Sequence, residues 1–434
     1  MNLIKITGKL TIILIAAVIL AILLLLIAYS IPVSPMAQEG KISGFLLAVE
    51  GSYPVIYETL LAGKVDNWVN ALMVNTAIYN GPEGLLDKVF HAYTVRYPDE
   101  NLIFALPHYF SFDNAGAISE SYTRYWHGYL IFLKPLLLFF HIEQIRLINL
   151  LFMVLLTMII VYLFKKQNLS AYSIPYILSL LFLLPGLLYK TMLYYGIVYL
   201  VQISMIIMLY KHSWLSQKER YVYFFFIIGI LACYIDILSF PLLSLGMPLT
   251  LYFLQTNHLS VQEAVKRFIA YTALWSAGFI FMWIGKWVAA SLYDRSFAPL
   301  LEALSSILER SGTADYFTGE VFSRFDAISI NIETAFIPFL CVFLTGSCYV
   351  IALYVMKRKT TRVKLTASHA VFVLIFILPF FWYYLCANHS YIHAFYTYRI
   401  LGMSVFALFC AILMCFEHQQ SHKKQKDYKS INNK

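Results

Sequence analysis

Charged side chains are scarce in this chain of 434 residues. Asp, Glu, Lys and Arg make up 13% of the sequence, whereas soluble globular proteins contain about 25%, so an ordinary water-soluble enzyme is excluded. A disordered chain is excluded because 60% of the residues are hydrophobic. The 19 Gly and 14 Pro are too few for a fibrous or low-complexity protein. The fold class that remains is an all-α integral membrane protein.

Cysteines are few, and nucleotide-binding motifs are absent from the sequence. The sequence has six cysteines, and all of them lie inside or at the ends of apolar segments, which excludes a disulfide framework and a cysteine-type metal site. No phosphate-binding glycine loop, dinucleotide fingerprint, Ser–His–Asp motif or HExxH motif is present. The sequence therefore gives no support to an ATP-driven or NAD-linked reaction.

Long apolar runs are the main positive signal, because a spanning helix needs about 20 mostly apolar residues. The first run follows Lys5 and Lys9 and is longer than the ~7–15 residues of a signal-peptide core, so we expect a retained anchor helix. The sequence predicts ten spans, at residues 10–31, 145–164, 171–189, 193–210, 221–239, 242–256, 268–289, 335–356, 368–386 and 400–416.

The distribution of charge predicts the orientation. With a cytoplasmic N-terminus, the inner segments carry 19 of the 32 Lys and Arg but only four of the 23 Asp and Glu, as the positive-inside rule requires. Both termini are then cytoplasmic, and the net charge of +9 is a topology signal rather than a nucleic-acid signal. The predicted location is a bacterial cytoplasmic membrane, with the lipid bilayer as a partner and no nucleic acid.

This topology leaves two long loops on the outer face. The predicted parts are an N-terminal anchor helix (1–31), a large extracytoplasmic loop (32–144), a transmembrane bundle (145–289), a second extracytoplasmic loop (290–334), C-terminal transmembrane helices (335–416) and a basic cytoplasmic tail (417–434). Apolar residues at helical spacing predict short interfacial helices inside both loops. Residues 129–140 are broken by Lys134 and Pro135, so we expect them to be re-entrant or interfacial rather than spanning.

Asp66 is the candidate catalytic acid of the first loop. It begins a helical pattern in Val65-Asp66-Asn67-Trp68, and the alternative role is a helix N-cap, which Asp favours. The two roles are compatible. Further along the loop, Arg124 and His127 stand among aromatic residues and are candidates for phosphate binding. The alternative for this stretch is an aromatic belt at the lipid headgroups.

Polar residues also gather in later outer segments. His389, His393 and Arg399 lie close together between the last two spans, again with an interfacial belt as the alternative. The two histidines have the spacing of metal ligands on a helix, but no third ligand is evident, so no metal site is predicted. Asp236 lies near the outer end of its span, and its alternative role is a hydrogen-bonded partner at the helix break before Pro241. Lys190 could pair with Asp236 or with a phosphate.

The order of these features resembles the C-type (GT-C) membrane glycosyltransferases. The resemblance lies in the N-terminal anchor and the long first outer loop with an Asp near its start. Arg124-Tyr125-Trp126-His127-Gly128-Tyr129 and His389-Ser390-Tyr391-Ile392-His393 also look like a group of uncharacterised bacterial membrane proteins with this layout. Family members generally take a sugar from a polyprenyl-phosphate or polyprenyl-diphosphate carrier. They use an acidic residue of the first outer loop as base or metal ligand, a role that the resemblance assigns here to Asp66.

The resulting hypothesis is a transferase that moves a sugar from a polyprenyl-phosphate carrier to a cell-envelope glycan or other acceptor on the outer face. Asp66 is the base, and Trp68 and Trp126 stack on sugar rings. Asp236 is a supporting acid. A divalent cation is allowed but not required. The donor phosphate is bound by residues from four segments, Arg124, His127, Lys190, His389, His393 and Arg399. The alternatives are a lipid-linked sugar or polysaccharide transporter or flippase, and a non-enzymatic envelope assembly protein.

Overall fold

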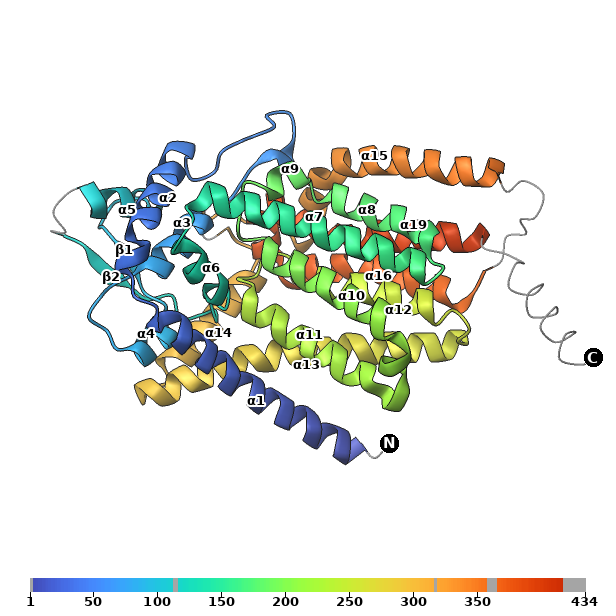
Figure 1. Cartoon of the computed structure of the whole chain (residues 1–434), viewed down its shortest axis with the longest axis horizontal. Helices are drawn as coiled ribbons and strands as arrows, with labels where there is room; N and C mark the ends of the chain where they lie inside the picture. The colour runs from blue at the N-terminus through green and yellow to red at the C-terminus, as the bar shows by residue number, and fades with distance from the viewer. Residues whose placement is uncertain (1–2, 112–115, 316–317, 357–364, 417–434) are drawn as a thin grey trace, which may run out of the picture.

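The computed structural model describes residues 3–111, 116–315, 318–356 and 365–416. Long helices run side by side through most of the molecule, and shorter elements gather at one end (Figure 1). The helices long and apolar enough to cross a membrane number seven in the described part: Ile4–Ser30, Ile142–Lys166, Tyr195–Ile235, Val261–Asp294, Arg324–Val355, Ala367–Leu385 and Ala394–Cys415. The expected multi-pass helical membrane protein is thereby confirmed.

The bundle begins with α1 (Leu3–Ser30) and continues after residue 140. Its elements are α7 (Ile142–Lys166), η3 (Ser170–Tyr172), α8 (Ser173–Phe182), α9 (Pro185–Leu188), α10 (Tyr195–Ser216), η4 (Gln217–Glu219), α11 (Arg220–Ile235), α12 (Leu243–Gln255), α13 (Val261–Asp294), α14 (Ala298–Ser311), α15 (Arg324–Met356), α16 (Ala367–Leu385), α17 (Ala387–Ile392), α18 (Ala394–Thr397), η5 (Tyr398–Leu401) and α19 (Gly402–Phe416).

Residues 34–111 and 116–137 form the group of short elements at one end of the bundle, which we call the cap (Figure 1). Its β-strands pair antiparallel, with Thr94 opposite Glu120. The cap also has a small apolar core of its own, to which Leu72, Val95 and Leu102 contribute. Its elements are η1 (Ser34–Met36), α2 (Ala37–Glu50), η2 (Leu61–Gly63), α3 (Asn67–Ile78), α4 (Leu85–His91), β1 (Thr94–Arg96), α5 (Leu102–Ser111), β2 (Ile118–Glu120) and α6 (Leu130–Leu137).

Some predicted boundaries differ from the structure. Residues 171–189 contain α8, of only 10 residues, and 242–256 contain α12, of 13 residues. Neither is a full-length span, so the count of ten stays a prediction. The second loop is shorter than 290–334, because α13 continues to Asp294 and α15 begins at Arg324; helical hydrogen bonding extends past the apolar run into polar residues. With eight residues, α6 is too short to cross a membrane. The tail 417–434 lies outside the described residues.

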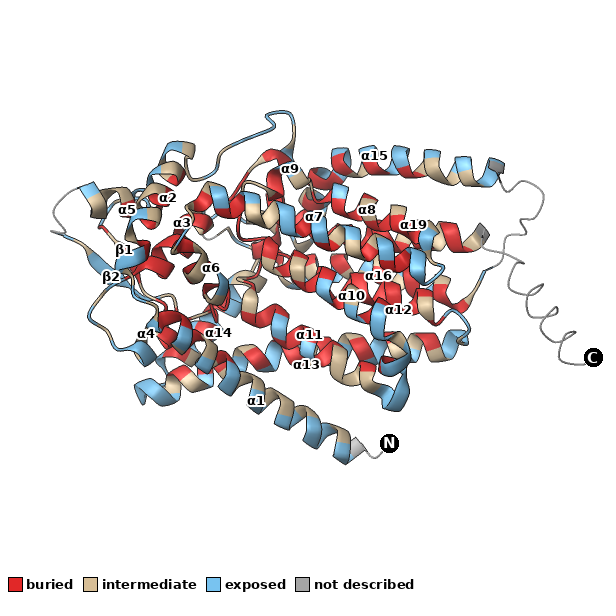
Figure 2. Cartoon of the chain, in the orientation of Figure 1, coloured by how far each residue is buried: buried red, intermediate tan, exposed pale blue. Residues whose placement is uncertain are grey.

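Apolar side chains cover the outside of the bundle as well as its interior. On α1, Ile12 is 68% exposed and Ile19 is 54% exposed, and exposed faces also run along α7 and α15 (Figure 2). Such surfaces are stable when they face lipid. By contrast, α12 is buried along nearly its whole length, because protein surrounds it on all sides.

Two glycines allow a close contact between α11 and α13. A Cβ atom at Gly229 on α11 would lie 2.0 Å from the Trp275 carbonyl oxygen, and a Cβ atom at Gly278 on α13 would lie 2.2 Å from that of Phe226. No other residue type allows the two backbones to approach so closely, which is how small residues act at helix interfaces in membranes.

One buried lysine attaches the cap to the bundle, and a second joins two helices within the cap. Lys286 on α13 donates hydrogen bonds to the carbonyl oxygens of Val89 (2.9 Å) and Phe90 (2.8 Å), near the C-terminal end of α4. Lys134 on α6 donates to the Ala77 carbonyl oxygen (2.6 Å) near the end of α3. Cations stabilise helix C-termini, where carbonyl groups lack helical partners. The cap helices therefore have fixed positions at the end of the bundle.

Candidate functional site

A folded loop places Asp66 at the beginning of α3. The Ser52 carbonyl oxygen accepts hydrogen bonds from the amides of Asn67 (3.0 Å) and Trp68 (3.1 Å). The turn that precedes them needs a glycine, because a Cβ atom at Gly63 would lie 2.2 Å from the Tyr57 carbonyl oxygen. Asp66 then caps the helix, with its Oδ1 accepting a hydrogen bond from the Val69 amide (3.0 Å). The N-cap role considered from the sequence is thus present.

The first turn of α3 is held by a network of buried polar groups. Asn67 donates to Glu50 (2.8 Å) and accepts from Arg146 (3.1 Å), whose side chain is fully buried. Asn70 accepts hydrogen bonds from the Thr191 hydroxyl (3.2 Å) and from the amide of Met192 (2.9 Å). Because these contacts come from α2, α7 and the chain before α10, they fix the position of Asp66 relative to the bundle.

The Asp66 carboxyl group is buried, with a relative exposure of 1%. Burial raises its pKa from 3.8 to about 7, while the hydrogen bond from Val69 and the positive charge of Lys64 act in the opposite direction. Among the described residues the Val69 amide is the one hydrogen-bond donor to this carboxylate. A carboxyl group with a pKa near neutrality is able to accept a proton from a substrate and release it again at physiological pH.

His389 on α17 and His393, which lies between α17 and α18, have ring centroids 4.9 Å apart. His389 Nε2 donates to the Leu238 carbonyl oxygen (2.8 Å), and His393 stacks on Tyr396 with centroids 5.0 Å apart. Burial, followed by the charges of Arg310 and Lys64, lowers the pKa of His393 to about 3. The pKa of His389 is lowered as well, chiefly by burial. Both rings are therefore neutral at pH 7 rather than cationic.

Two cations from separate loops lie near these histidines. Lys64 Nζ lies over the rings of Tyr53 (4.6 Å) and Phe395 (4.9 Å), so the loop before Asp66 reaches α18. Arg310, near the end of α14, donates to the Tyr125 hydroxyl (2.9 Å) and acts electrostatically on both histidines. The first loop, the second loop and the loop before α19 thus converge in one region.

Arg399 lies beneath this region and is fully buried. Its Nε donates to the Leu183 carbonyl oxygen and its Nη1 to that of Phe395, both at 3.0 Å. Its guanidinium lies 4.7 Å from the centroid of the Tyr194 ring. In the described part of the chain, Arg399 Nη2 and the Tyr194 hydroxyl have no hydrogen-bond partner. Tyr194 is also within electrostatic range of Asp66, so the acid and the arginine lie near the same ring.

The aromatic stretch after residue 121 lies in the packed interior. Trp126 is fully buried, and its indole donates to the Met282 carbonyl oxygen (2.9 Å). His127 uses both ring nitrogens, toward the Tyr129 hydroxyl and the Tyr122 carbonyl oxygen (3.0 Å each), and burial lowers its pKa to about 3. These side chains pack the junction of cap and bundle rather than facing Asp66.

Arg124 and Trp68 are more accessible than Trp126 and His127. Arg124 lies over the Tyr122 ring (4.9 Å) and 3.9 Å from Glu302, where no described contact joins it to Asp66. Trp68 is half-buried in the cap, under the guanidinium of Arg96 at 5.9 Å. Of the two tryptophans expected to stack on sugars, Trp68 is thus the one that follows Asp66 on the same helix.

Lys190 and Asp236 do not pair with each other. Lys190 Nζ contacts Glu50 (3.0 Å) and Glu143 (3.2 Å), the same carboxylates that neutralise Arg146. Asp236 accepts from the amide (2.8 Å) and hydroxyl (2.5 Å) of Ser239 and so closes the turn after α11. The suggested pairing of Lys190 with Asp236 is wrong, because Lys190 forms ion pairs with Glu50 of the cap and with Glu143 instead. The alternative reading of Asp236 as a hydrogen-bonded partner at the helix break is correct.

Three residues of this region were missed by the sequence analysis: Lys64, Tyr194 and Arg310. Lys64 is two residues before Asp66, so its position in the sequence already indicated a cation close to the candidate acid. The positions of Tyr194 and Arg310 depend on contacts between segments more than 100 residues apart, and no spacing rule predicts those. Within the described residues, no group of three or more His, Cys, Asp or Glu side chains is placed to hold a metal ion.

Comparisons with known proteins give no match: no family model matches the chain, and neither does any curated protein or solved structure.

Proposed function

We propose that this protein is a membrane glycosyltransferase of the GT-C kind, which transfers a sugar from a polyprenyl-phosphate carrier to a cell-envelope acceptor. The observation that carries the proposal is the convergence of a buried acid with cations from other loops. Asp66 and Lys64 come from the first loop, Arg310 from the second and Arg399 from the region before α19. A base beside a group of cations is what sugar transfer from a phosphate carrier needs.

In the proposed reaction, Asp66 removes the proton of the acceptor hydroxyl as its oxygen attacks the anomeric carbon of the donor. The bond between that carbon and the phosphate oxygen breaks, its electron pair stays on the phosphate, and the sugar inverts. Lys64, Arg310 and Arg399 neutralise the polyprenyl phosphate that leaves, which is already a good leaving group. The neutral His393 offers an N–H donor to the same phosphate, and Trp68 stacks on a sugar ring. His389, which donates its N–H to the Leu238 carbonyl oxygen, positions His393.

The proposal includes an orientation and a location. The cap lies on the outer face of a bacterial cytoplasmic membrane, and both termini are cytoplasmic. The carrier lipid lies along the apolar outside of the bundle, which exposes many large apolar side chains, and its phosphate enters the region beneath the cap. The partners are the lipid bilayer, the lipid-linked sugar and a glycan or other envelope acceptor.

The test is turnover of polyprenyl-phosphate sugars by the purified protein in lipid, with wild type and Asp66→Asn compared. Asn is as good an N-cap as Asp, so the variant keeps the helix start but loses the base. We expect its turnover to fall by roughly 10²–10⁴-fold, the usual contribution of a general base. The matched control is Asp99→Asn, which makes the same change at an exposed residue of the cap at the end of the bundle. Asp99 has a left-handed backbone, which Asn also tolerates.

Each outcome separates the proposal from its alternatives. Loss of donor consumption in Asp66→Asn but not in Asp99→Asn supports the transferase and its base. Equal turnover in wild type and Asp66→Asn removes Asp66 from the chemistry. Absence of turnover with a broad panel of donors contradicts the enzyme and favours a role in lipid-linked sugar transport or in envelope assembly.

A further inference from the structure

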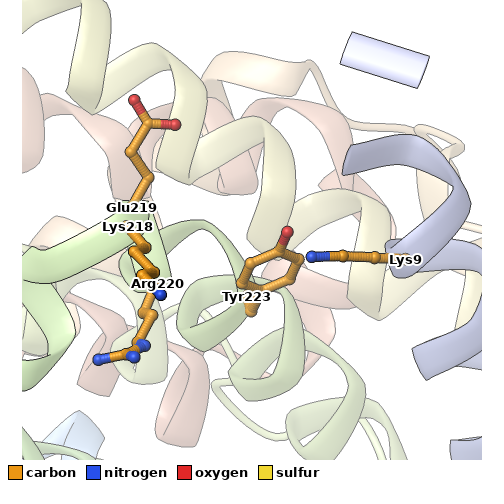
Figure 3. Close-up of a pocket in the computed structure, with 5 residues that line it drawn as sticks. All are labelled: Lys9, Lys218, Glu219, Arg220 and Tyr223. Atoms are coloured by element: carbon orange, nitrogen blue, oxygen red, sulfur yellow. The ribbon is translucent and has the colours of Figure 1, made fainter. Parts of the chain in front are cut away.

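A hollow of about 480 Å³ lies at the end of the bundle far from the cap. It opens between the beginning of α1 and the turn that joins α10 to α11 (Figure 3). Its lining consists of Lys9, Lys218, Glu219, Arg220 and Tyr223. Three of these five side chains are cations and one is an anion, so the hollow has a net positive charge.

The side chains in this hollow differ in direction. Lys9 and Tyr223 point toward each other from α1 and α11, while the carboxylate of Glu219 points away from both (Figure 3). In the described part of the chain, Lys9, Lys218 and Arg220 form no ion pair. The three cations of the hollow are therefore not paired with a carboxylate, and Glu219 offsets only part of their charge.

The turn itself is held in an unusual conformation. Lys218 and Glu219 both have left-handed backbones, with φ of 51° and 54°, a conformation that is unfavourable for residues other than glycine. Arg220 is fixed beside it, with Nη1 donating to the Trp214 carbonyl oxygen (2.8 Å) and the guanidinium 4.1 Å from the Trp214 ring. Trp214 is 52% exposed, and exposed tryptophans at helix ends are typical of the membrane–water interface.

We propose that this hollow binds the phosphate group of an anionic phospholipid. Lys9, Lys218 and Arg220 neutralise the phosphate, the Tyr223 hydroxyl donates a hydrogen bond to it, and the acyl chains lie on α1. Only 11% of the apolar part of α1 is buried in the protein, so lipid must supply most of its neighbours. Basic pockets between spanning helices on the cytoplasmic side are known to bind anionic headgroups, because Lys and Arg attract the negative charge of the phosphate. The bound lipid joins α1 to the α10–α11 turn.

The test is a binding titration of phosphatidylglycerol to the full-length protein in neutral detergent micelles. Mass spectrometry of the intact complex counts the lipids that are bound. We expect one tight site in the wild type. Lys9→Gln, which changes an exposed side chain, weakens it by roughly fivefold, and the double variant with Arg220→Gln weakens it by a similar further factor. Phosphatidylcholine, which is neutral overall, does not occupy the site.

Two controls keep the result specific. Lys211→Gln with Lys266→Gln removes the same charge outside the hollow and leaves phosphatidylglycerol binding unchanged. Inorganic phosphate at the concentration of the lipid does not compete. Equal weakening by the control pair, or no weakening by Lys9→Gln with Arg220→Gln, overturns the proposal. Competition by inorganic phosphate shows that the ligand is free phosphate and contradicts the lipid.

Discussion

At the scale of single residues, Asp66 combines a structural and a chemical property. Its carboxylate caps α3 through the Val69 amide, and burial raises its pKa to about 7. His389 and His393 lie in the same region. They are neutral because burial and nearby positive charges lower their pKa values. Near pH 7, Asp66 is therefore the group of this region whose charge responds to small changes of pH.

This property predicts the pH dependence of the proposed transfer. The base must be ionised, so kcat/KM rises with pH and levels off above about 7, and a pH–rate profile from about pH 5 to 9 measures it. The ionisation also affects stability. Between 3.8 and about 7, folded Asp66 holds a proton that the unfolded chain has released, so stability falls as pH rises through this window.

Asp66→Asn cannot ionise and is the control for both measurements. Its melting temperature, compared with that of the wild type, lacks the decline that Asp66 causes between pH 4 and 7. A flat pH–rate profile in the wild type would contradict the role of Asp66 as base. Identical pH dependence of melting in the two proteins would contradict the raised pKa.

At the scale of secondary-structure elements, a group of charges joins α2, α3, α7 and the chain before α10. Arg146 contacts Glu50 (2.9 Å), Glu143 and Asn67, and its side chain is fully buried. Lys190 contacts the same two carboxylates, but its side chain is 31% exposed. The two cations therefore differ in how much water screens them, and the buried one holds the first turn of α3.

We predict that Arg146→Ala destabilises the protein by about 3 kcal/mol, because it removes a fully buried guanidinium that contacts Glu50, Glu143 and Asn67 at once. Lys190→Ala, in the same group of charges, costs only about 1 kcal/mol or less because solvent screens it. Thermal unfolding in detergent measures both. Because Asn67 adjoins Asp66, Arg146→Ala also lowers turnover. Equal destabilisation by the two variants would contradict the importance of Arg146 burial.

At the scale of the whole molecule, the cap and the basic hollow lie at opposite ends of the bundle (Figure 1). The acid and cations of the candidate site are at one end, and the turns that carry Lys218 and His258 are at the other. A membrane across the bundle would separate the two ends. The location of each end can therefore be tested independently of any activity.

The proposed orientation places the cap outside the cell. We expect Asp99→Cys, at an exposed cap residue, to react with a membrane-impermeant maleimide in intact cells. His258→Cys, at an exposed residue of the turn after α12, should react only after the membrane is opened. The wild-type chain gives the background of its own six cysteines. If only His258→Cys is labelled in intact cells, the cap lies on the cytoplasmic side. This result would contradict transfer on the outer face.

The sequence by itself determined the membrane class and the helix start at Asp66, because apolar runs and N-caps are properties of neighbouring residues. It also predicted a role for the segments around residues 66 and 389–399, which stays a prediction. Only the tertiary structure decided which side chains meet: His389 with the Leu238 carbonyl, Lys190 with Glu50, and Trp126 with the interior. These pairs are more than 100 residues apart in the chain. Their contacts depend on how whole helices pack, which no local period or spacing specifies.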